Sequence, residues 1–337
     1  MSEHKILHVM ILDKFLASYI EFIDKNFGRE NHHYVFITSE KYEYGLTPEH
    51  KVEFLHTDDD IFITLLKYMK MAKKIILHGL WRDKVDILLY FNQELLKKCY
   101  WVMWGGDFYF PETKSNIRKE IIKNMGYCIT SNNQEFLYLK NCYDTSAKSY
   151  EFIFYPINLC FTKPETTTKN VDNKVILVGN SATETNRHLE IFYILKNYSN
   201  ISIVVPLSYG NSNYKTQIIA EGQKIFGNRF KPILDLMTYD DYIDLLKTID
   251  IAIFNNNRQQ AGGNILTLLG LGKTIYLSDE NLLSKFCFDK GLKFNNIKSI
   301  YDNLNEISTK DKIKNYMIIK EYCSEHKSYL EWKKIFE

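Results

Sequence analysis

The chain has 337 residues, of which 45% are hydrophobic and 25% are charged, and its formal net charge is +2. This length exceeds that of a typical single-core domain and predicts two domains. A net charge so close to zero disfavours nucleic acid as a partner, because proteins that bind nucleic acid carry a strong basic excess.

The first half of the chain alternates short apolar runs with helical patterns. Strands are predicted at residues 5–12, 33–38, 52–57, 74–79, 99–105 and 127–130. Helices are predicted at residues 14–26, 60–72, 114–125 and 133–142. Short buried strands separated by helices are typical of parallel βαβ units. Residues 1–156 are therefore expected to form one Rossmann-like domain.

A threonine-rich polar stretch with prolines, residues 157–173, has the composition of a linker. A second alternating series follows over residues 174–310. Its strands are predicted at residues 174–180, 201–207, 229–233, 250–255 and 273–278. Residues 311–337 are predicted to form a polar helical tail. We therefore expect an α/β protein with two Rossmann-like domains facing a cleft, with ligands bound where strands end.

Several common binding motifs are absent or incomplete. Residues 272–274 (GKT) resemble the end of a P-loop, but Thr267 stands where that motif requires glycine. No GxGxxG follows the first strand, which disfavours a nicotinamide or flavin cofactor. Asp58 and Asp60 form a DxD pair that could hold a divalent metal ion, but capping of the helix that follows at once is the favoured interpretation. No metal site is predicted.

Three polar loops follow strands of the second domain and predict a site for an anionic ligand. Glycine permits close backbone approach, amides and hydroxyls supply donors and acceptors, and a helix N-terminus attracts phosphate. Arg258 can pair with phosphate oxygens through two hydrogen bonds. For the first loop, a plain turn with a helix cap is an equal alternative. The candidate binding residues are Gly179, Asn180, Ser181, Asn186, His188, Ser208, Tyr209, Gly210, Asn256, Arg258, Gln259, Gln260, Gly263 and Asn264.

Two carboxylates of the first domain are candidate general bases. Asp13 follows the first strand, and Asp107 follows the strand at residues 99–105, next to Gly105 and Gly106, which would let a ligand approach the backbone. The alternative is structural: Asp13 caps the next helix and Asp107 supports an Asx-turn.

Three lysines suggest a second kind of surface. Lys67, Lys70 and Lys74 are predicted on one helical face beside apolar residues, which allows contact with an anionic membrane surface. A solvated face of an amphipathic helix is the favoured alternative.

The stretches "WVMWGGDFY", "ILVGNSATETNRHLE", "VPLSYG" and "IFNNNRQQAGGNILTLLGLGKTIYL" together resemble glycosyltransferase family 56, the TDP-N-acetylfucosamine:lipid II N-acetylfucosaminyltransferases. The resemblance runs from His8 to about Leu277. Ala182 departs from it, since the family commonly has glycine there. The resemblance implies a GT-B fold, with the nucleotide-sugar donor in the C-terminal domain and the acceptor in the N-terminal domain.

The implied reaction moves 4-acetamido-4,6-dideoxygalactose (Fuc4NAc) from a TDP-sugar to an undecaprenyl-diphosphate-linked saccharide, as in the synthesis of enterobacterial common antigen. No metal or other cofactor is implied. Arg258 would stabilise the leaving diphosphate, and Asp13 or Asp107 would act as the base. The N-terminal residues lack the features of a signal peptide, so we expect a cytoplasmic protein, peripheral on the inner face of the cell inner membrane. The alternatives are a transferase for a UDP- or GDP-linked sugar, or a non-catalytic polysaccharide-assembly protein.

Overall fold

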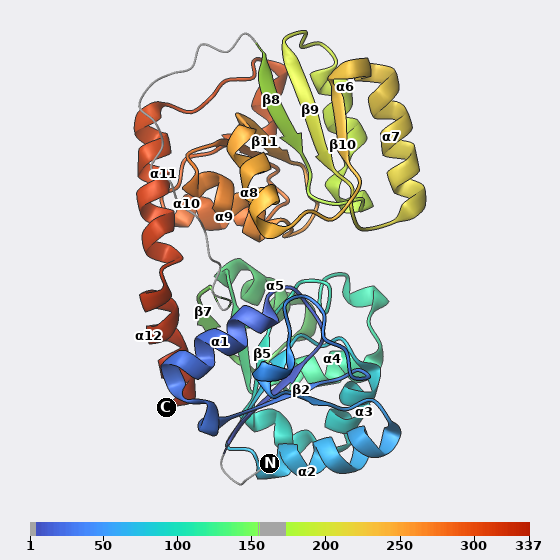
Figure 1. Ribbon diagram of the computed structural model, residues 1–337, viewed down its shortest axis with the longest axis vertical. Coiled ribbons are helices and arrows are strands. Elements are labelled where there is room, and N and C mark those ends of the chain that lie inside the picture. Colours follow the sequence, from blue (N-terminus) through green and yellow to red (C-terminus); the bar gives the residue numbers. More distant parts are fainter. Residues whose placement is uncertain (1–4, 154, 156–172) are drawn as a thin grey trace. The chain divides into compact units, whose positions relative to one another are not determined.

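The computed structural model describes residues 5–153, 155 and 173–337, which divide into two compact units (Figure 1). One unit holds strands β1 to β7 and the chain from Cys323 to Glu337, and the other holds β8 to β13 and ends at Tyr322. Each unit is built on one parallel sheet with helices between its strands, so the predicted α/β class is confirmed. Except for Asn173, the predicted linker lies outside the described residues.

The first sheet has the order β3-β2-β1-β4-β5-β6-β7. Its strands are β1 (Ile6–Met10), β2 (His32–Phe36), β3 (Glu53–Phe54), β4 (Lys74–His78), β5 (Cys99–Val102), β6 (Tyr127–Thr130) and β7 (Lys148–Glu151). The helices are α1 (Leu16–Phe27), a π-helix (Asp60–Leu65) that continues into α2 (Leu66–Met71), α3 (Asp83–Phe91), α4 (Asn116–Lys123) and α5 (Asn133–Tyr143). The chain passes from β1 to β2 on one side and later crosses to β4 on the other. The carboxyl ends of β1 and β4 are therefore a switch point, where sheets of this kind bind ligands.

The second sheet has the order β10-β9-β8-β11-β12-β13. Its strands are β8 (Lys174–Val178), β9 (Ile201–Pro206), β10 (Phe230–Ile233), β11 (Ile251–Phe254), β12 (Thr274–Leu277) and β13 (Asn295–Asn296). The helices are α6 (His188–Leu195), α7 (Ser212–Phe226), α8 (Tyr239–Thr248), α9 (Gly262–Gly270), α10 (Leu283–Asp289) and α11 (Thr309–Tyr322). The equivalent switch point lies between β8 and β11.

Each unit has its own apolar core. In the second unit, Ile203 and Ile253 of the sheet pack with Phe192 of α6 and Ile218 of α7, and all four are fully buried. In the first unit, Tyr19 and Ile23 of α1 pack with Phe152 and with α12 (Glu325–Phe336). Strands buried on both faces explain why the sequence shows continuous apolar runs at these positions.

The predicted helical tail, residues 311–337, is not a separate element. Its first helix, α11, belongs to the second unit. There the Asn315 side chain accepts a hydrogen bond from the Lys293 N–H and donates one to the Lys293 carbonyl. The second, α12, buries Trp332, Ile335 and Phe336 in the core of the first unit. Three apolar residues at helical spacing in a polar sequence are enough for this packing. The boundary predicted at residue 310 is therefore replaced by one at Tyr322.

The predicted common face of Lys67, Lys70 and Lys74 is wrong for Lys74. Helix α2 ends at Met71, and Lys74 is the first residue of β4, with its ammonium group donating to the Ile335 carbonyl. Lys67 and Lys70 are exposed. Among the described helices, none combines the length and apolarity required to cross a bilayer.

Candidate functional site

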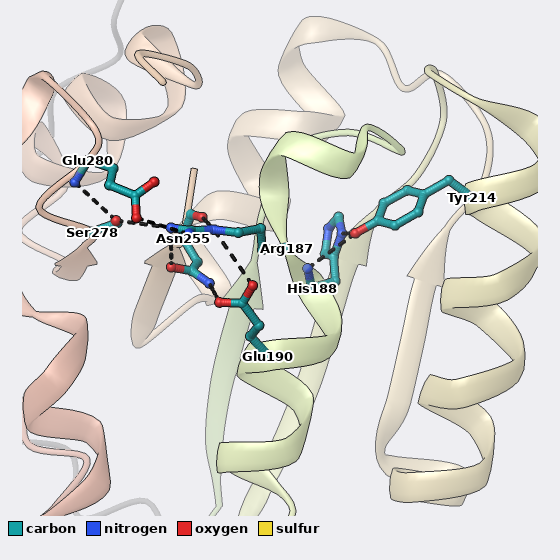
Figure 2. A network of polar contacts seen from close by, with 7 residues as sticks. All are labelled: Arg187, His188, Glu190, Tyr214, Asn255, Ser278 and Glu280. Carbon is teal, nitrogen blue, oxygen red and sulfur yellow. Dashed lines mark hydrogen bonds and ion pairs between the residues drawn. The ribbon is translucent and has the colours of Figure 1, made fainter. Parts of the chain in front are cut away.

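The loop that follows β8 begins with a glycine that is required by its neighbours. Gly179 has φ +69°, and a Cβ there would lie 2.5 Å from His188 Nε2 and 2.9 Å from Asn186 Oδ1. The groups that approach this glycine closely are therefore side chains of the protein itself, where the sequence predicted a ligand. His188 is fully buried at the start of α6, and its Nδ1 is hydrogen-bonded to the Tyr214 hydroxyl at 3.1 Å (Figure 2). Burial lowers the pKa of His188 to about 3, so the ring is neutral near pH 7.

Asn186 holds the β8 loop in shape. Its Oδ1 accepts from the backbone N–H of Asn180 at 3.1 Å and from Asn256 Nδ2 at 3.0 Å. Its Nδ2 donates to the Ser181 carbonyl at 3.1 Å and to Thr183 Oγ1 at 2.8 Å. With only 1% of its surface exposed, Asn186 positions the loop and does not face a ligand directly.

Gln260 links the loop after β11 to the loop after β8 at the switch point. Its Oε1 accepts from Thr185 Oγ1 at 2.6 Å. Its Nε2 lies within hydrogen-bond distance of Asn180 Oδ1, Ser181 Oγ and Thr183 Oγ1, at 3.0 to 3.1 Å. The predicted binding residues of these two loops are thus brought together, and the Gln260 amide is used within the protein.

The loop after β9 pairs with the same β8 loop. The Tyr209 carbonyl accepts from the Ala182 N–H at 2.8 Å, and a Cβ on Gly210 would lie 2.4 Å from the Ala182 carbonyl oxygen. Ala182 is completely buried, so its methyl group points away from solvent. The Tyr209 hydroxyl accepts from Asn180 Nδ2 at 3.1 Å while 49% of the residue is exposed. Ser208 is half-buried beside it.

Helix α9 begins with an open N-terminus. Ala261 precedes it with φ +63°, and no side chain caps the first turn. Gly263 is exposed, and nothing lies within 4 Å of the position that its Cβ would take. The first N–H groups of a helix have no acceptor within it and attract anions. Arg258 is half-buried in the loop before α9. Its Nη1 donates to the carbonyl of the next residue, Gln259, at 3.0 Å. Asn264 is half-buried in the first turn of α9.

A second arginine of this region was missed by the sequence reasoning. Arg187 precedes α6 with φ +48°, and its guanidinium donates to the Asn255 carbonyl at 2.9 Å, Asn255 Oδ1 at 3.0 Å, Ser278 Oγ at 3.2 Å and Glu280 Oε1 at 3.1 Å (Figure 2). Asn255 in turn donates to Glu190 Oε2 at 2.9 Å. Arg187 thereby connects the loops after β8, β11 and β12. The signal for it was an arginine at a strand-to-helix junction within the polar stretch already singled out.

The two candidate bases of the first unit lie in different surroundings. Asp107 is completely buried, and its carboxylate accepts from Trp101 Nε1 at 2.8 Å, the Leu80 N–H at 3.1 Å and the Trp104 N–H at 3.2 Å. These contacts favour its structural alternative. Asp13 is half-buried, and its Oδ1 accepts from the Phe15 N–H at 3.1 Å. Burial raises the pKa of Asp13, opposed by that hydrogen bond and by Lys14.

The contacts of Asp60 are those expected from the capping interpretation, whereas Asp58 contacts a lysine side chain. Asp60 Oδ2 accepts from the backbone N–H groups of His56 and Thr57, at 3.1 and 3.0 Å, and these bonds lower the pKa of Asp60. Asp58 forms an ion pair with Lys84. Within the described part of the chain, no group of three or more histidine, cysteine or acidic side chains is placed to hold a metal ion.

Comparison with known proteins gives a family and a fold. The family model described as "4-alpha-L-fucosyltransferase glycosyl transferase group 56" matches residues 9–321. A glycosyltransferase from Rickettsia africae ESF-5 superposes with a TM-score of 0.72 at 11% identity, over 100% of this chain and 98% of that one. Anabaena Alr3699/HepE in complex with UDP and glucose gives 0.71 at 10% identity, over 98% of each chain. Sucrose-phosphate synthase from Thermosynechococcus elongatus gives 0.70 at 9% identity, over 99% of this chain and 98% of that one. These similarities establish the GT-B fold.

Proposed function

The chain belongs to glycosyltransferase family 56, and on this premise we propose that it transfers Fuc4NAc from a TDP-sugar to an undecaprenyl-diphosphate-linked saccharide. The observation that carries the proposal is the meeting of three polar loops at the β8–β11 switch point, beside the open N-terminus of α9. Ligands of parallel sheets bind at such points.

The donor diphosphate is assigned to the α9 end of the site. The N–H groups at Gly263 and Asn264 and the guanidinium of Arg258 supply positive charge where the leaving diphosphate becomes negative. The exposed Tyr209 ring, held by Asn180 through its hydroxyl, offers a flat apolar surface on which the nucleobase stacks. Anabaena Alr3699/HepE, which shares the fold, was solved with UDP, and this supports a nucleoside diphosphate donor.

The proposed step is displacement of TDP from the anomeric carbon. The acceptor hydroxyl gives its proton to Asp13, its oxygen forms the new bond to the sugar, and the bond to the diphosphate breaks with its electron pair. A carboxyl pKa raised by burial makes Asp13 a stronger base than an exposed aspartate. The positive groups near the diphosphate come from this chain, so the proposal requires no metal ion.

The acceptor places the enzyme at a membrane surface. A saccharide carried on undecaprenyl diphosphate stays at the bilayer, so we propose a cytoplasmic enzyme bound peripherally to the inner face of the inner membrane. The exposed Lys67 and Lys70 of α2 would favour the approach to anionic lipid.

A nucleotide-sugar panel tests the donor. TDP-, UDP- and GDP-linked sugars are assayed with a defined undecaprenyl-diphosphate disaccharide, and TDP-Fuc4NAc is expected to be transferred fastest. Preference for a UDP-sugar would replace the donor assignment, and the UDP complexes of the Anabaena protein make that the second candidate. Nucleotide binding without transfer from any sugar would support a non-catalytic assembly protein instead.

Arg258→Ala tests the diphosphate site. We expect the donor KM to rise at least about tenfold, because a charge-assisted bond to phosphate contributes roughly 1.5–3 kcal/mol. The control is Lys231→Ala, which removes an exposed cation from the same unit and should leave the donor KM unchanged. Equal donor kinetics in the two variants would refute this role for Arg258.

A further inference from the structure

Loops after three neighbouring strands of the first sheet carry aromatic side chains to one place. Phe15 follows β1, Trp81 follows β4 and Trp104 follows β5, and these strands lie side by side in the sheet with β4 in the middle. The place is the switch point of the first unit. Asp13, the proposed base, lies in the same loop as Phe15 and accepts its N–H.

The three rings form one cluster, called here the aromatic platform (Phe15, Trp81 and Trp104). The Trp104 ring meets Trp81 edge to face at 6.0 Å between centroids and an angle of 88°, and it meets Phe15 at 6.2 Å and 64°. All three side chains are only half-buried. By contrast, the core residues Trp101 and Trp332 of the same unit are completely buried.

The buried Tyr155 holds two rings of the aromatic platform in place. The Tyr155 ring stacks on Phe15 at 5.7 Å with an angle of 6°, and the Tyr155 hydroxyl accepts from Trp104 Nε1 at 3.1 Å. That hydroxyl is also hydrogen-bonded to His78 Nδ1 at 2.8 Å. The rings are therefore held in defined orientations, as a surface built for recognition must be.

Two glycines make room for the indole of Trp81. A Cβ on Gly79 would lie 2.0 Å from Trp81 Nε1, and a Cβ on Gly106 would lie 2.8 Å from Trp81 Cη2. Gly79 also has φ +83°, which disfavours any other residue there. The space that the sequence reasoning assigned to a ligand at Gly106 is thus taken by the Trp81 ring, which becomes the candidate ligand-contacting group.

We propose that the aromatic platform is the acceptor subsite and stacks against a pyranose ring of the acceptor saccharide. One face of a pyranose presents only C–H groups and packs on an aromatic ring, while its hydroxyls lie at the edge, where Asp13 can reach one of them. A lipid tail would also contact apolar rings, but it has no hydroxyl for a carboxylate to deprotonate. The inference rests on the proposed transferase function, which requires a saccharide acceptor beside the base.

Tryptophan fluorescence tests the platform without requiring turnover. The chain has four tryptophans, and because Trp101 and Trp332 are fully buried, acrylamide quenching reports mainly on Trp81 and Trp104. The probe is a farnesyl-diphosphate-linked disaccharide of N-acetylated hexosamines, and farnesyl diphosphate alone is the control for the lipid and phosphate parts. We expect the disaccharide probe to reduce the quenching constant by about half, since it covers the accessible rings, and the control to leave it unchanged. Unchanged quenching with the disaccharide, or equal protection by the control, overturns the inference.

Kinetics of Trp81 variants give a second measurement. Trp81→Ala should raise the acceptor KM about 3–10-fold, in line with the strength of aromatic contacts, with the donor KM unchanged. Trp81→Phe should recover most of the affinity because it keeps a ring. Phe91→Ala, an exposed aromatic at the end of α3 with 76% of its surface accessible, is the matched control. If the two Trp81 variants have the acceptor KM of the wild type, the platform does not bind the acceptor.

The two proposals fail separately in these experiments. Protection of the tryptophans without transfer from any nucleotide sugar would leave the subsite standing and refute the transferase assignment. Transfer with unchanged quenching and unchanged acceptor KM would do the reverse.

Discussion

Asp107 and Asp13 follow central strands of the same sheet, but their carboxylates lie in different surroundings, Asp107 completely buried and Asp13 half-buried. Asp107 accepts three hydrogen bonds from two loops and a strand, and no part of it is exposed. Asp107→Asn should lower the free energy of unfolding by about 1–3 kcal/mol, because the amide group turns one acceptor into a donor that faces an N–H. Activity per folded molecule should be retained. The measurement is urea unfolding together with transfer assays at equal folded concentration.

Asp13→Asn is the comparison for that experiment. It should abolish most transfer, since an amide cannot accept the proton, and it should change stability little at a half-buried site. If Asp107→Asn loses turnover and Asp13→Asn keeps it, the two assignments must be exchanged.

Gln260 joins the β8 loop to the β11 loop, and we expect its loss to affect the proposed donor site through the β8 loop. Gln260→Ala removes the bonds to Thr185, Asn180 and Ser181, so the β8 loop loses its contact with the β11 loop. We expect the donor KM to rise about 10-fold with a smaller change in kcat, measured by donor titration at saturating acceptor. Gln223→Ala, on the exposed side of α7, removes the same side chain without these contacts and should behave as wild type.

The sequence located the loops of the candidate site but not the direction of their side chains. Glycine and amide residues after β8, β9 and β11 were predictable, because polar loops must follow buried parallel strands. Whether an amide faces a ligand or another loop depends on which strands are neighbours, and β8 next to β11 is a tertiary fact. For that reason Asn186 and Gln260 were predicted as ligand contacts, and Arg187 was missed.

Strongly apolar strands were predictable from the sequence, whereas two of the four edge strands were not. Strands β1 to β6 and β8 to β12 correspond to predicted runs. The missed strands, β7 (Lys148–Glu151) and β13 (Asn295–Asn296), lie at sheet edges, where one side is open and an apolar pattern is not required. Helix α3 was missed because its acidic start, Asp83 and Asp86, interrupts the apolar pattern, although Asp86 is paired with Arg118.

Helix α12 is expected to contribute strongly to the stability of the first unit. Trp332 is fully buried against Tyr19 and Phe152 of the first unit, so Trp332→Ala should lower the free energy of unfolding by about 3–5 kcal/mol. Leu330→Ala on the same helix, at a residue with 43% of its surface exposed, should cost less than about 1 kcal/mol. Urea unfolding followed by tryptophan fluorescence reads this out, because Trp81, Trp101 and Trp104 all lie in the first unit. Equal midpoints for the two variants would mean that α12 does not contribute to that core.

For the molecule as a whole, buried histidines make the two units respond differently to acid. His8 Nε2 is 2.9 Å from His32 Nδ1, and His8 Nδ1 is 3.3 Å from His78 Nε2, all within the first unit. Burial lowers the pKa of His32 and of His78 to about 3, and burial together with its two histidine neighbours lowers that of His8. The second unit has one comparable group, His188.

The sign of the effect follows from proton binding. The unfolded chain takes up a proton near pH 6.5 and the folded chain only near pH 3, so stability is fully present above about pH 6.5 and falls as the pH is lowered. From pH 6.5 to pH 5, His32 and His78 should each contribute a loss of about 2 kcal/mol. Asp86 opposes them: burial raises its pKa to about 6, so its protonation in the folded state returns about 1 kcal/mol by pH 5. The first unit should therefore lose a net few kcal/mol.

The variant His32→Gln tests one of these three linked histidines. Glutamine keeps a polar group toward His8 but does not titrate, so the variant should lose about 2 kcal/mol less than wild type between pH 7 and pH 5. Tryptophan fluorescence follows the first unit, and far-ultraviolet circular dichroism follows both, in urea titrations at the two pH values. In the wild type, the urea midpoint measured by fluorescence should fall more steeply with acid than the midpoint of the dichroism transition that comes from the second unit. If His32→Gln and the wild type show the same pH dependence, this buried histidine does not set the acid sensitivity. The loss of unfolding free energy would then come from the other titrating groups of the first unit.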